Sequence, residues 1–352
     1  MYSPWTPTKE EYSTLFKSLP KYRIDQLWKG LYEESKNISE ITALPLNLRS
    51  ELEEKYKPAL TAVTKQESSD SLTTKWLHEL PDGKAIETVL MHYDKRSTVC
   101  VSSQAGCAMG CGFCATGQAG YERSLEVGEI LEQIIIAQNE CKLSDRRLSN
   151  IVFMGMGEPM ANYPKVIASI RRIITDLNIG ARNITLSTIG LIPQINSFAE
   201  EGLQVGLAVS LHAANDKKRS ELIPINKQHP IEKLVEACKN FKTKTNRRVS
   251  FEWAMIDGVN DSFEDAIELA SITKRAQAHV NLIPLNPTPG WPTKGSSPEA
   301  INKFVAILKD KGVNITVRKN RGTDIDAACG QLKSKHQTTS VSLSKKKSNH
   351  NS

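Results

Sequence analysis

Three cysteines in this 352-residue chain lie close enough together to bind a metal cluster. Cys107, Cys111 and Cys114 have the spacing C-x3-C-x2-C, with glycines at positions 106, 110 and 112. Three thiolates on so short a loop can hold three corners of an iron–sulfur cube, and the glycines let backbone N–H groups approach the sulfides. The fourth iron would stay open to a small molecule. The alternatives are a zinc site completed by a distant ligand, or reduced core cysteines.

A second motif, Met-Gly-Met-Gly-Glu-Pro, spans residues 154–159. It looks at first like a dinucleotide-binding loop, but Met160 stands where the third glycine of that loop is required. Bare backbone at Gly157 beside the carboxylate of Glu158 suits an α-ammonium group instead. The alternative is a glycine turn whose glutamate caps a helix.

Short β-branched runs alternate with helical patterns from about Lys95 onwards. Strand and helix in strict succession imply a parallel sheet with right-handed crossovers. Six or seven such units are too few for a closed eight-stranded barrel, so we predict an α/β fold with an incomplete (β/α)6-type barrel. The predicted strands are residues 99–103, 150–154, 183–187, 205–211, 248–255, 279–284 and 315–318, and the predicted helices are 127–140, 164–177, 192–201, 231–242, 263–275 and 298–311.

Three of these strand ends carry polar residues that core packing would not demand. Ser187 ends one strand, Ser210-Leu211-His212 ends another, and Asn286 follows a third. In a parallel barrel the reactive site lies at the carboxyl ends of the strands. A serine or histidine at a strand end is more often a local hydrogen-bonding residue than a ligand. Gathered round one barrel mouth, however, these residues become candidate cofactor contacts.

Three regions are expected along the chain. Residues 1–92 read as a small accessory domain, with helices at 21–34 and 47–56 and a hairpin whose strands 72–80 and 84–92 flank the turn Pro81-Asp82-Gly83. Residues 93–332 form the predicted barrel. Residues 333–352, rich in Ser, Lys, Asn and His, are expected to be a disordered basic tail.

The composition excludes disordered, fibrous and membrane-spanning classes. The chain is 39% hydrophobic and 24% charged, and no apolar run reaches the roughly 18 residues of a membrane span. The start of the chain lacks the apolar core of a signal peptide, so we expect a cytoplasmic protein. The net charge is +7, but five lysines of the tail account for all except +2, so bulk charge alone is weak evidence for nucleic acid.

Seven cysteines, an odd number, do not suggest a structural disulfide framework. Cys100 lies seven residues before Cys107, and Cys329 lies beyond the last predicted strand in an Ala-Ala-Cys run. Taken alone, both read as small buried core residues. Cys141 and Cys238 fall near apolar helical faces and are expected to pack in the core.

Several segments together resemble the radical S-adenosylmethionine (SAM) adenine methyltransferases of ribosomal RNA, the RlmN/Cfr type. The likeness covers about Glu87 to Leu332, and the three-cysteine loop, with Phe113 before its last cysteine, resembles the superfamily's signature. Within the family, the segments MGMGEP and NLIPLNP look like the housekeeping branch that methylates carbon 2 of adenine. The segments are CVSSQAGCAMGCGFCATG, FMGMGEP, LSTIGLIP, VSLHAANDKKRSELIPINK, NLIPLNPTPG and VRKNRGTDIDAACGQL.

The resemblance implies cofactors and site residues. Cys107, Cys111 and Cys114 would hold a [4Fe-4S] cluster, and two molecules of SAM would be used per turnover. Gly157 and Glu158 would contact the amino group of SAM, and the further contacts would come from Ser187, Ser210, Leu211, His212 and Asn286.

The resemblance also gives roles to the two lone cysteines. Cys329 would accept a methyl from one SAM, and a 5′-deoxyadenosyl radical from a second would remove a hydrogen from it. The carbon radical would then add to adenine, whose carbon 2 is too electron-poor to attack SAM itself. After the adduct has lost one electron and the carbon-2 proton, the thiolate of Cys100 would attack the sulfur of Cys329 and release the product by forming a transient disulfide. Glu87 would accept the carbon-2 proton; its alternative is an exposed hairpin carboxylate.

The implied substrates are an adenine of 23S ribosomal RNA, in the peptidyl-transferase region, and an adenine in the anticodon loop of some transfer RNAs. The resemblance also implies that the accessory domain of residues 1–92 helps to engage RNA. A reductase would donate electrons, and the chain would act as a monomer away from membranes. Three alternatives stay open: the carbon-8 methyltransferases of the resistance branch, a radical-SAM activase of another protein, and a non-catalytic RNA-binding module stapled by metal. The activase has no use for Cys100 and Cys329, and the module has none for Gly157 and Glu158.

Overall fold

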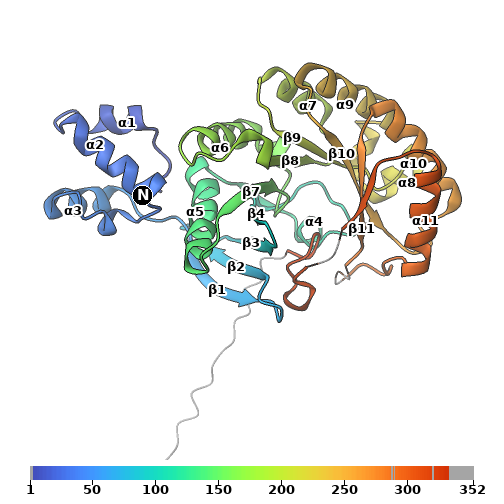
Figure 1. Cartoon of the computed structure of the whole chain (residues 1–352), viewed down its shortest axis with the longest axis horizontal. Coiled ribbons are helices and arrows are strands. Elements are labelled where there is room, and N and C mark those ends of the chain that lie inside the picture. The colour runs from blue at the N-terminus through green and yellow to red at the C-terminus, as the bar shows by residue number, and fades with distance from the viewer. Residues whose placement is uncertain (1–2, 287, 289, 319–320, 333–352) are drawn as a thin grey trace, which may run out of the picture.

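The computed structural model describes residues 3–286, 288, 290–318 and 321–332. A helical unit at the N-terminus projects from one side of a larger α/β body (Figure 1). The predicted tail at 333–352 lies outside the described residues. Among the helices of the described part, none has the length and apolar character needed to cross a membrane.

The N-terminal unit packs around the apolar face that the sequence predicts. Ile24, Leu27, Leu31 and Tyr32 are buried there, and Trp28 packs against them. A capping box at Thr8 fixes the start of the first helix, because the Thr8 hydroxyl accepts from the Glu11 N–H at 3.2 Å. The helices are α1 (Lys9–Leu15), α2 (Lys21–Trp28), a π-helical turn (Lys29–Glu33) and α3 (Leu46–Lys55).

A ten-stranded sheet forms the centre of the larger body, in the order β1-β2-β3-β4-β7-β8-β9-β10-β11-β12. Strands β1 to β4 pair antiparallel, and from β4 to β12 the pairing is parallel. The strands are β1 (Thr61–Glu67), β2 (Thr73–Glu79), β3 (Ala85–Tyr93), β4 (Arg96–Cys100), β7 (Leu148–Phe153), β8 (Ile184–Thr188), β9 (Gly206–Ser210), β10 (Val249–Met255), β11 (His279–Pro284) and β12 (Ile315–Val317). A separate hairpin pairs β5 (Gln104–Gly106) with β6 (Tyr121–Ser124).

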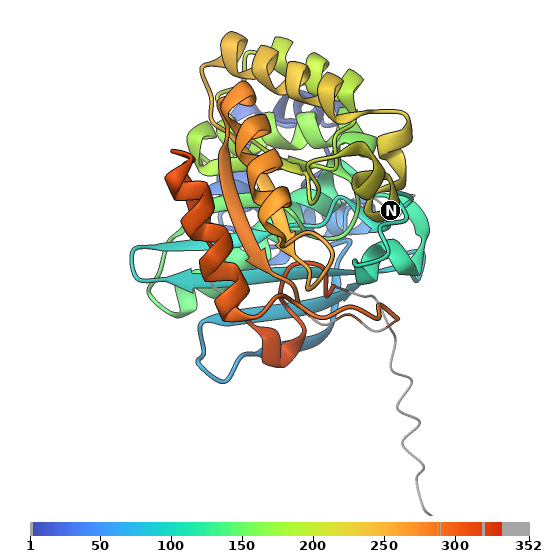
Figure 2. The same ribbon diagram turned by 90° about the vertical axis from the view of Figure 1, so that its right-hand side faces the viewer.

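Helices cover the outer face of the curved sheet (Figures 1 and 2). Each long helix connects two parallel strands, as right-handed crossovers do. The helices are α4 (Ala115–Ala119), α5 (Val127–Leu143), α6 (Tyr163–Thr175), α7 (Ile192–Glu200), α8 (Asp216–Leu222), α9 (Ile231–Thr245), α10 (Phe263–Ala276) and α11 (Pro298–Asp310).

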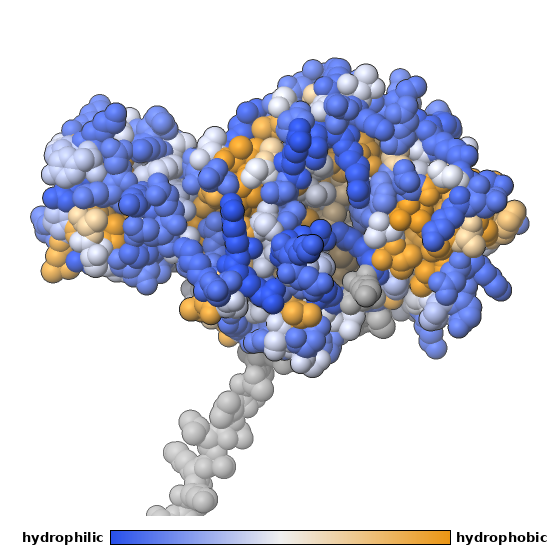
Figure 3. All heavy atoms as spheres, viewed as in Figure 1, coloured by the Kyte–Doolittle hydropathy of each residue, from blue (hydrophilic) through white to orange (hydrophobic). Residues whose placement is uncertain are grey.

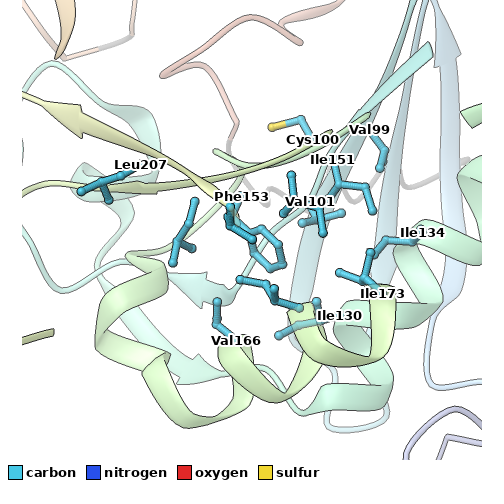
Figure 4. Close-up of a cluster of buried hydrophobic side chains, with 14 of the residues drawn as sticks. Val99, Cys100, Val101, Ile130, Ile134, Ile151, Phe153, Val166, Ile173 and Leu207 are labelled. Carbon is cyan, nitrogen blue, oxygen red and sulfur yellow. The ribbon is translucent and has the colours of Figure 1, made fainter. Parts of the chain in front are cut away.

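Alternation along β4 separates the core from the interior of the barrel. Val99 and Val101 are buried among the side chains of α5 and α6, where Ile130, Ile134 and Ile173 also lie (Figure 4). Cys100 lies between the two valines and points its sulfur away from them (Figure 4). The core therefore fixes β4, and β4 directs one thiol into the barrel.

The predicted incomplete α/β barrel is confirmed. Seven strands, β4 and β7 to β12, run parallel, and in the described part of the chain the sheet ends at β1 and β12 without closing. The sheet also crosses the predicted domain boundary at residue 92, because β3 pairs with β4. The hairpin of the predicted accessory domain thus extends the barrel sheet, and its helices pack beside α6, where Arg172 donates to the Tyr32 hydroxyl.

Candidate active site

The three-cysteine loop lies between β5 and α4, at the carboxyl ends of the parallel strands. Two of its glycines are required by close packing. Gly106 has φ +72°, and a Cβ there would lie 2.0 Å from the Gly120 carbonyl oxygen. A Cβ on Gly112 would lie 2.3 Å from the ring of Trp291. These glycines therefore fold the loop tightly against its neighbours.

Cys107, Cys111 and Cys114 line one cavity, called here the cysteine pocket. Burial raises the pKa of Cys107 to about 11 and raises that of Cys111 well above its usual range, and Glu158 and Cys114 add to both shifts. Without a cation these two thiols would stay protonated at neutral pH. A further part of the lining is Gly157, Glu158, Ser187, Ser210, His212, Asn286 and Cys329.

The donor set fits an iron–sulfur cluster. Three thiols of one short loop face one pocket, and metal binding would offset the cost of ionising them. Within the described residues, no three His, Cys, Asp or Glu side chains are grouped as the ligands of a single metal ion would be. A cube needs a wider arrangement, because each thiolate binds an iron of its own.

Glu158 is buried, and both of its carboxylate oxygens accept backbone N–H groups. Oε1 accepts from Met160 at 2.9 Å, and Oε2 accepts from Ile189 at 2.8 Å. Burial raises its pKa to about 7, against these hydrogen bonds. The capping role that the sequence left open is thus present, and it also ties the end of β7 to the end of β8.

Gly157 is fixed by its backbone conformation and by its neighbour. Its φ is +95°, and an added Cβ would lie 2.5 Å from the Cβ of Gln104. The side-chain oxygen of Gln104 accepts from the Glu158 N–H at 2.9 Å. Any larger residue at position 157 would disturb this loop.

Of the five strand-end residues that the sequence proposed as SAM contacts, four line the cysteine pocket and Leu211 does not. Ser187 is the last residue but one of β8, Ser210 is the last residue of β9, and Asn286 donates from Nδ2 to the Cys329 carbonyl at 3.3 Å. The side chain of Leu211 is completely buried in the hydrophobic core, while its N–H donates to the Glu252 carbonyl at 3.0 Å. Leu211 can therefore reach a ligand only through its backbone.

His212 is a rigid neutral side chain. Its Nδ1 accepts from the Ala254 N–H at 2.9 Å, and its ring lies edge-on to Phe113 with centroids 4.9 Å apart. Burial lowers its pKa to about 3, and Arg219 adds to this shift. It therefore offers a flat uncharged ring to the pocket.

Cys100 and Cys329 line a second, larger cavity inside the barrel, called here the barrel cavity, and both are free thiols. Burial raises the pKa of Cys100 to about 12, and the nearby Cys329 adds to the effect. Cys329 is exposed to solvent at the cavity surface, yet partial desolvation within the barrel raises its pKa, while the guanidinium of Arg318, 3.9 Å from its sulfur, opposes that rise. Cys329 lines both cavities and lies where they meet.

Glu87 lies apart from both linings. It is buried on β3 and faces Lys75, whose Nζ is 3.2 Å from Oε1. Lys75 also donates to the Asp326 carbonyl at 3.3 Å, in the segment that carries Cys329. The alternative of an exposed hairpin carboxylate is therefore excluded, and the role of Glu87 as proton acceptor stays a prediction.

The chain matches known proteins over most of its length. The model of the radical SAM superfamily matches residues 101–270. A protein of Dictyoglomus thermophilum described as a probable dual-specificity RNA methyltransferase RlmN is 48% identical over 317 residues, covering 89% of this chain and 91% of its own. The Staphylococcus aureus protein of the same description is 47% identical over 321 residues, which are 90% of this chain and 88% of its own.

The chain belongs to the RlmN family of dual-specificity RNA methyltransferases. The crystal structure of a radical SAM methyltransferase from Sphaerobacter thermophilus superposes with a TM-score of 0.92 at 45% identity, covering 94% of this chain and 99% of that one. Membership of the radical SAM superfamily implies a [4Fe-4S] cluster and SAM. In this RlmN-family chain the cysteine pocket has the donors for both.

Sequence reasoning missed two charged residues that face Cys329. Arg318 reaches its sulfur, and Glu252 on β10 lies 3.7 Å from Arg318 and lines both cavities. It also missed Arg219, which is fully buried and donates to the carbonyls of Ile189 and Leu211. Arg219 and Arg318 stand in the segments quoted for the family resemblance. Their position within these segments was the one sign in the sequence that could have marked the two arginines as site residues.

Proposed function

We propose that this chain methylates carbon 2 of an adenine in the peptidyl-transferase region of 23S ribosomal RNA, and of an adenine in the anticodon loop of some transfer RNAs. One observation carries the proposal. Cys100 and Cys329 line the same barrel cavity, and Cys329 also lines the cysteine pocket. A methyl carrier must meet a cofactor on one side and a nucleotide on the other.

Cys107, Cys111 and Cys114 would hold a [4Fe-4S] cluster, and Gly157 and Glu158 would meet the amino end of SAM bound at the open iron. The cluster and two molecules of SAM per turnover supply a transferable methyl group and a strong hydrogen-abstracting radical. Ser187, Ser210, His212, Asn286 and the backbone of Leu211 would complete the SAM site. His212 is suited to this because it stays neutral and rigid.

Cys329 is the proposed methyl carrier, and Arg318 and Asn286 position it. Asn286 holds the Cys329 carbonyl, and Arg318 lies beside the sulfur. A cation at this distance favours the thiolate, which is the nucleophilic form of cysteine. The methylated sulfur would then carry the one-carbon unit to adenine.

Cys100 is the proposed resolving thiol. Its thiolate would attack the sulfur of Cys329, so that a disulfide forms as the bond between that sulfur and the adenine-linked carbon breaks. The electron pair of the broken bond goes to the carbon, which takes up a proton and becomes the new methyl. The disulfide is then reduced by cytosolic thiols for the next turnover.

Glu87 is the proposed acceptor of the carbon-2 proton. The support is the family position alone, because Glu87 faces Lys75 rather than a cavity. Glu252 is a carboxylate of the cavity lining itself and provides the comparison. If Glu87→Gln retains full methylation while Glu252→Gln abolishes it, the role moves to Glu252.

The remaining parts of the proposal concern the surroundings of the enzyme. It acts in the cytoplasm as a monomer and takes electrons from a reductase. Mass analysis of ribosomal RNA nucleosides from a deletion strain tests substrate and position together. We expect 2-methyladenosine to be lost. Loss of 8-methyladenosine instead would assign the resistance branch, and no change would favour a non-catalytic RNA-binding module or an activase.

A further inference from the structure

The barrel cavity opens at the end of the barrel opposite the cysteine pocket. Its volume is about 670 Å³, and its lining includes residues at the starts of the parallel strands. Arg96 is the first residue of β4, Arg182 lies two residues before β8, and Arg248 directly precedes β10. The amino ends of parallel strands share one edge of a sheet. The three-cysteine loop lies at the other edge, so the barrel is entered from two ends that meet at Cys329.

Five arginines from four separate segments line this mouth. They are Arg96, Arg182, Arg247, Arg248 and Arg321, called here the mouth arginines. Among the described residues, none of the five forms an ion pair with a carboxylate. The acidic side chain of the lining is Glu252, which already faces Arg318.

Two of the mouth arginines, Arg182 and Arg247, lie close to each other despite their like charge. Burial lowers the pKa of Arg247, and the charge of Arg182 lowers it further. The Nε of Arg247 is buried without a hydrogen-bond partner. Asp70 lies near enough for the charge of Arg321 to lower its pKa, but it forms no ion pair with any of the five. Guanidinium groups gathered at one opening without ion pairs suit an anion with several charges, because each planar fork can take a phosphate in two hydrogen bonds.

An aromatic ring lies within the same mouth. The guanidinium carbons of Arg96 and Arg321 lie 4.7 Å and 4.5 Å from the centre of the Tyr93 ring. Tyr93 also lines the cavity. Cations and aromatic rings placed together are typical of surfaces that hold single-stranded nucleic acid by its phosphates and bases. Figure 3 shows the hollow in the larger body with hydrophilic residues, in blue, around it.

We propose that the mouth arginines bind the phosphate backbone of the RNA substrate, so that the target nucleotide enters the barrel from the amino ends of the strands while SAM occupies the carboxyl ends. This inference rests on the proposed function. A base inside the duplex or stacked in a loop cannot reach Cys329, so it must be flipped out and inserted. The phosphates on either side of it then stay at the rim, where the five cations are.

The test compares two double variants of the cluster-loaded enzyme. Arg182→Gln with Arg247→Gln removes two mouth charges. Lys233→Gln with Lys239→Gln removes two charges from the exposed face of α9 and is the matched control. The probe is a fluorescent RNA hairpin with an unpaired adenine, and its affinity is measured by anisotropy over a range of salt concentrations.

We expect the mouth variant to bind the hairpin more weakly and with a smaller salt dependence. Each lost phosphate contact lowers the slope of log K against log salt by roughly 0.7 to 0.9, so two contacts lower it by about 1.5. Arg182→Lys with Arg247→Lys should keep most of the slope. A mouth variant with wild-type affinity and slope, or a control that falls as far, would overturn the proposal.

Two measurements distinguish a failure of this inference from a failure of the proposed function. Methylation of Cys329 in cells, seen by intact mass, needs SAM but no RNA and should be normal in the mouth variant. If the double variant fails to fold, the exposed Arg248→Gln should still lower the slope by roughly 0.7 to 0.9, and an unchanged slope would overturn the proposal. Cys100→Ala is also made in two forms, one with the wild-type mouth arginines and one with the mouth variant. Trapped RNA on both forms would contradict this inference alone. Trapped RNA on neither form would contradict the proposed function.

Discussion

The two ends of the barrel are built in different ways. At the carboxyl ends, the cysteine pocket is small and made of groups held by close packing, such as Gly157 against Gln104 and Glu158 against two backbone amides. At the amino ends, the barrel cavity is wide and lined by long charged side chains. The first arrangement suits a cofactor of fixed shape, and the second suits a charged polymer.

Loss of one cluster cysteine should have the largest effect and should affect one end only. Cys107→Ala, Cys111→Ala and Cys114→Ala should each fold, lose visible colour and lose all methylation, because a required corner of the cube is missing. RNA affinity should stay normal because the mouth arginines are untouched. Iron analysis and absorption spectra check this.

Cys238 provides the control for those variants. It is completely buried in the core on α9, and Cys238→Ala should cost on the order of 1 kcal/mol while keeping colour and turnover. Wild-type iron content in any of the three cluster variants would disprove the cluster assignment.

Cys329→Ala should remove the link between the two ends while leaving each intact. The variant should keep its cluster, bind RNA and cleave SAM slowly with reductant, but transfer no methyl, because the acceptor sulfur is gone. Intact mass after expression should show one extra methyl on Cys329 in the wild type. A methyl found on Cys100 instead would reverse the two roles.

Gly157→Ala should weaken the cofactor end without abolishing it. The added Cβ would lie 2.5 Å from Gln104 at φ +95°, a strain of about 1–3 kcal/mol. We expect a lower melting temperature and weaker SAM binding with unchanged RNA affinity. Gly180→Ala is the control, since the nearest atom to its Cβ is 3.8 Å away. Equal SAM affinity in both variants would contradict a special role for Gly157.

The pH should affect the release step more than the cofactor end. Burial raises the pKa of Cys100 to about 12, so below that pH its thiolate fraction rises about tenfold for each pH unit. Single-turnover release of methylated RNA should therefore speed up about a hundredfold from pH 7 to pH 9. SAM cleavage without RNA is measured alongside, and release that is flat over this range would mean that Cys100 does not limit it.

The difference between the ends explains what the sequence could predict. The alternating strands and helices were predictable because β-branched runs and helical faces repeat, and the cysteine pocket was marked by cysteines and glycines at short fixed spacings. β1 was missed because all its residues are exposed and carry no buried alternation, and α8 was missed because it has seven residues.

Side-chain placement was harder to predict than element type. Leu211 was expected to contact SAM, yet its side chain packs in the core. Glu87 was expected to accept a proton from the substrate, yet its carboxylate pairs with Lys75. Both outcomes depend on which face of a strand meets which neighbour. The mouth arginines were missed for another reason: they come from four separate segments and share no motif, so only the fold brings them to one opening.

The most direct test of the central claim is purification of Cys100→Ala from cells. Methylation of Cys329 and its addition to adenine precede the step that needs Cys100, so the variant should stall as a covalent adduct. We expect ribonuclease-resistant nucleotide on the protein and, after digestion, a Cys329 peptide joined to adenosine through a methylene bridge. A variant that comes off free of RNA and still methylates would contradict the account.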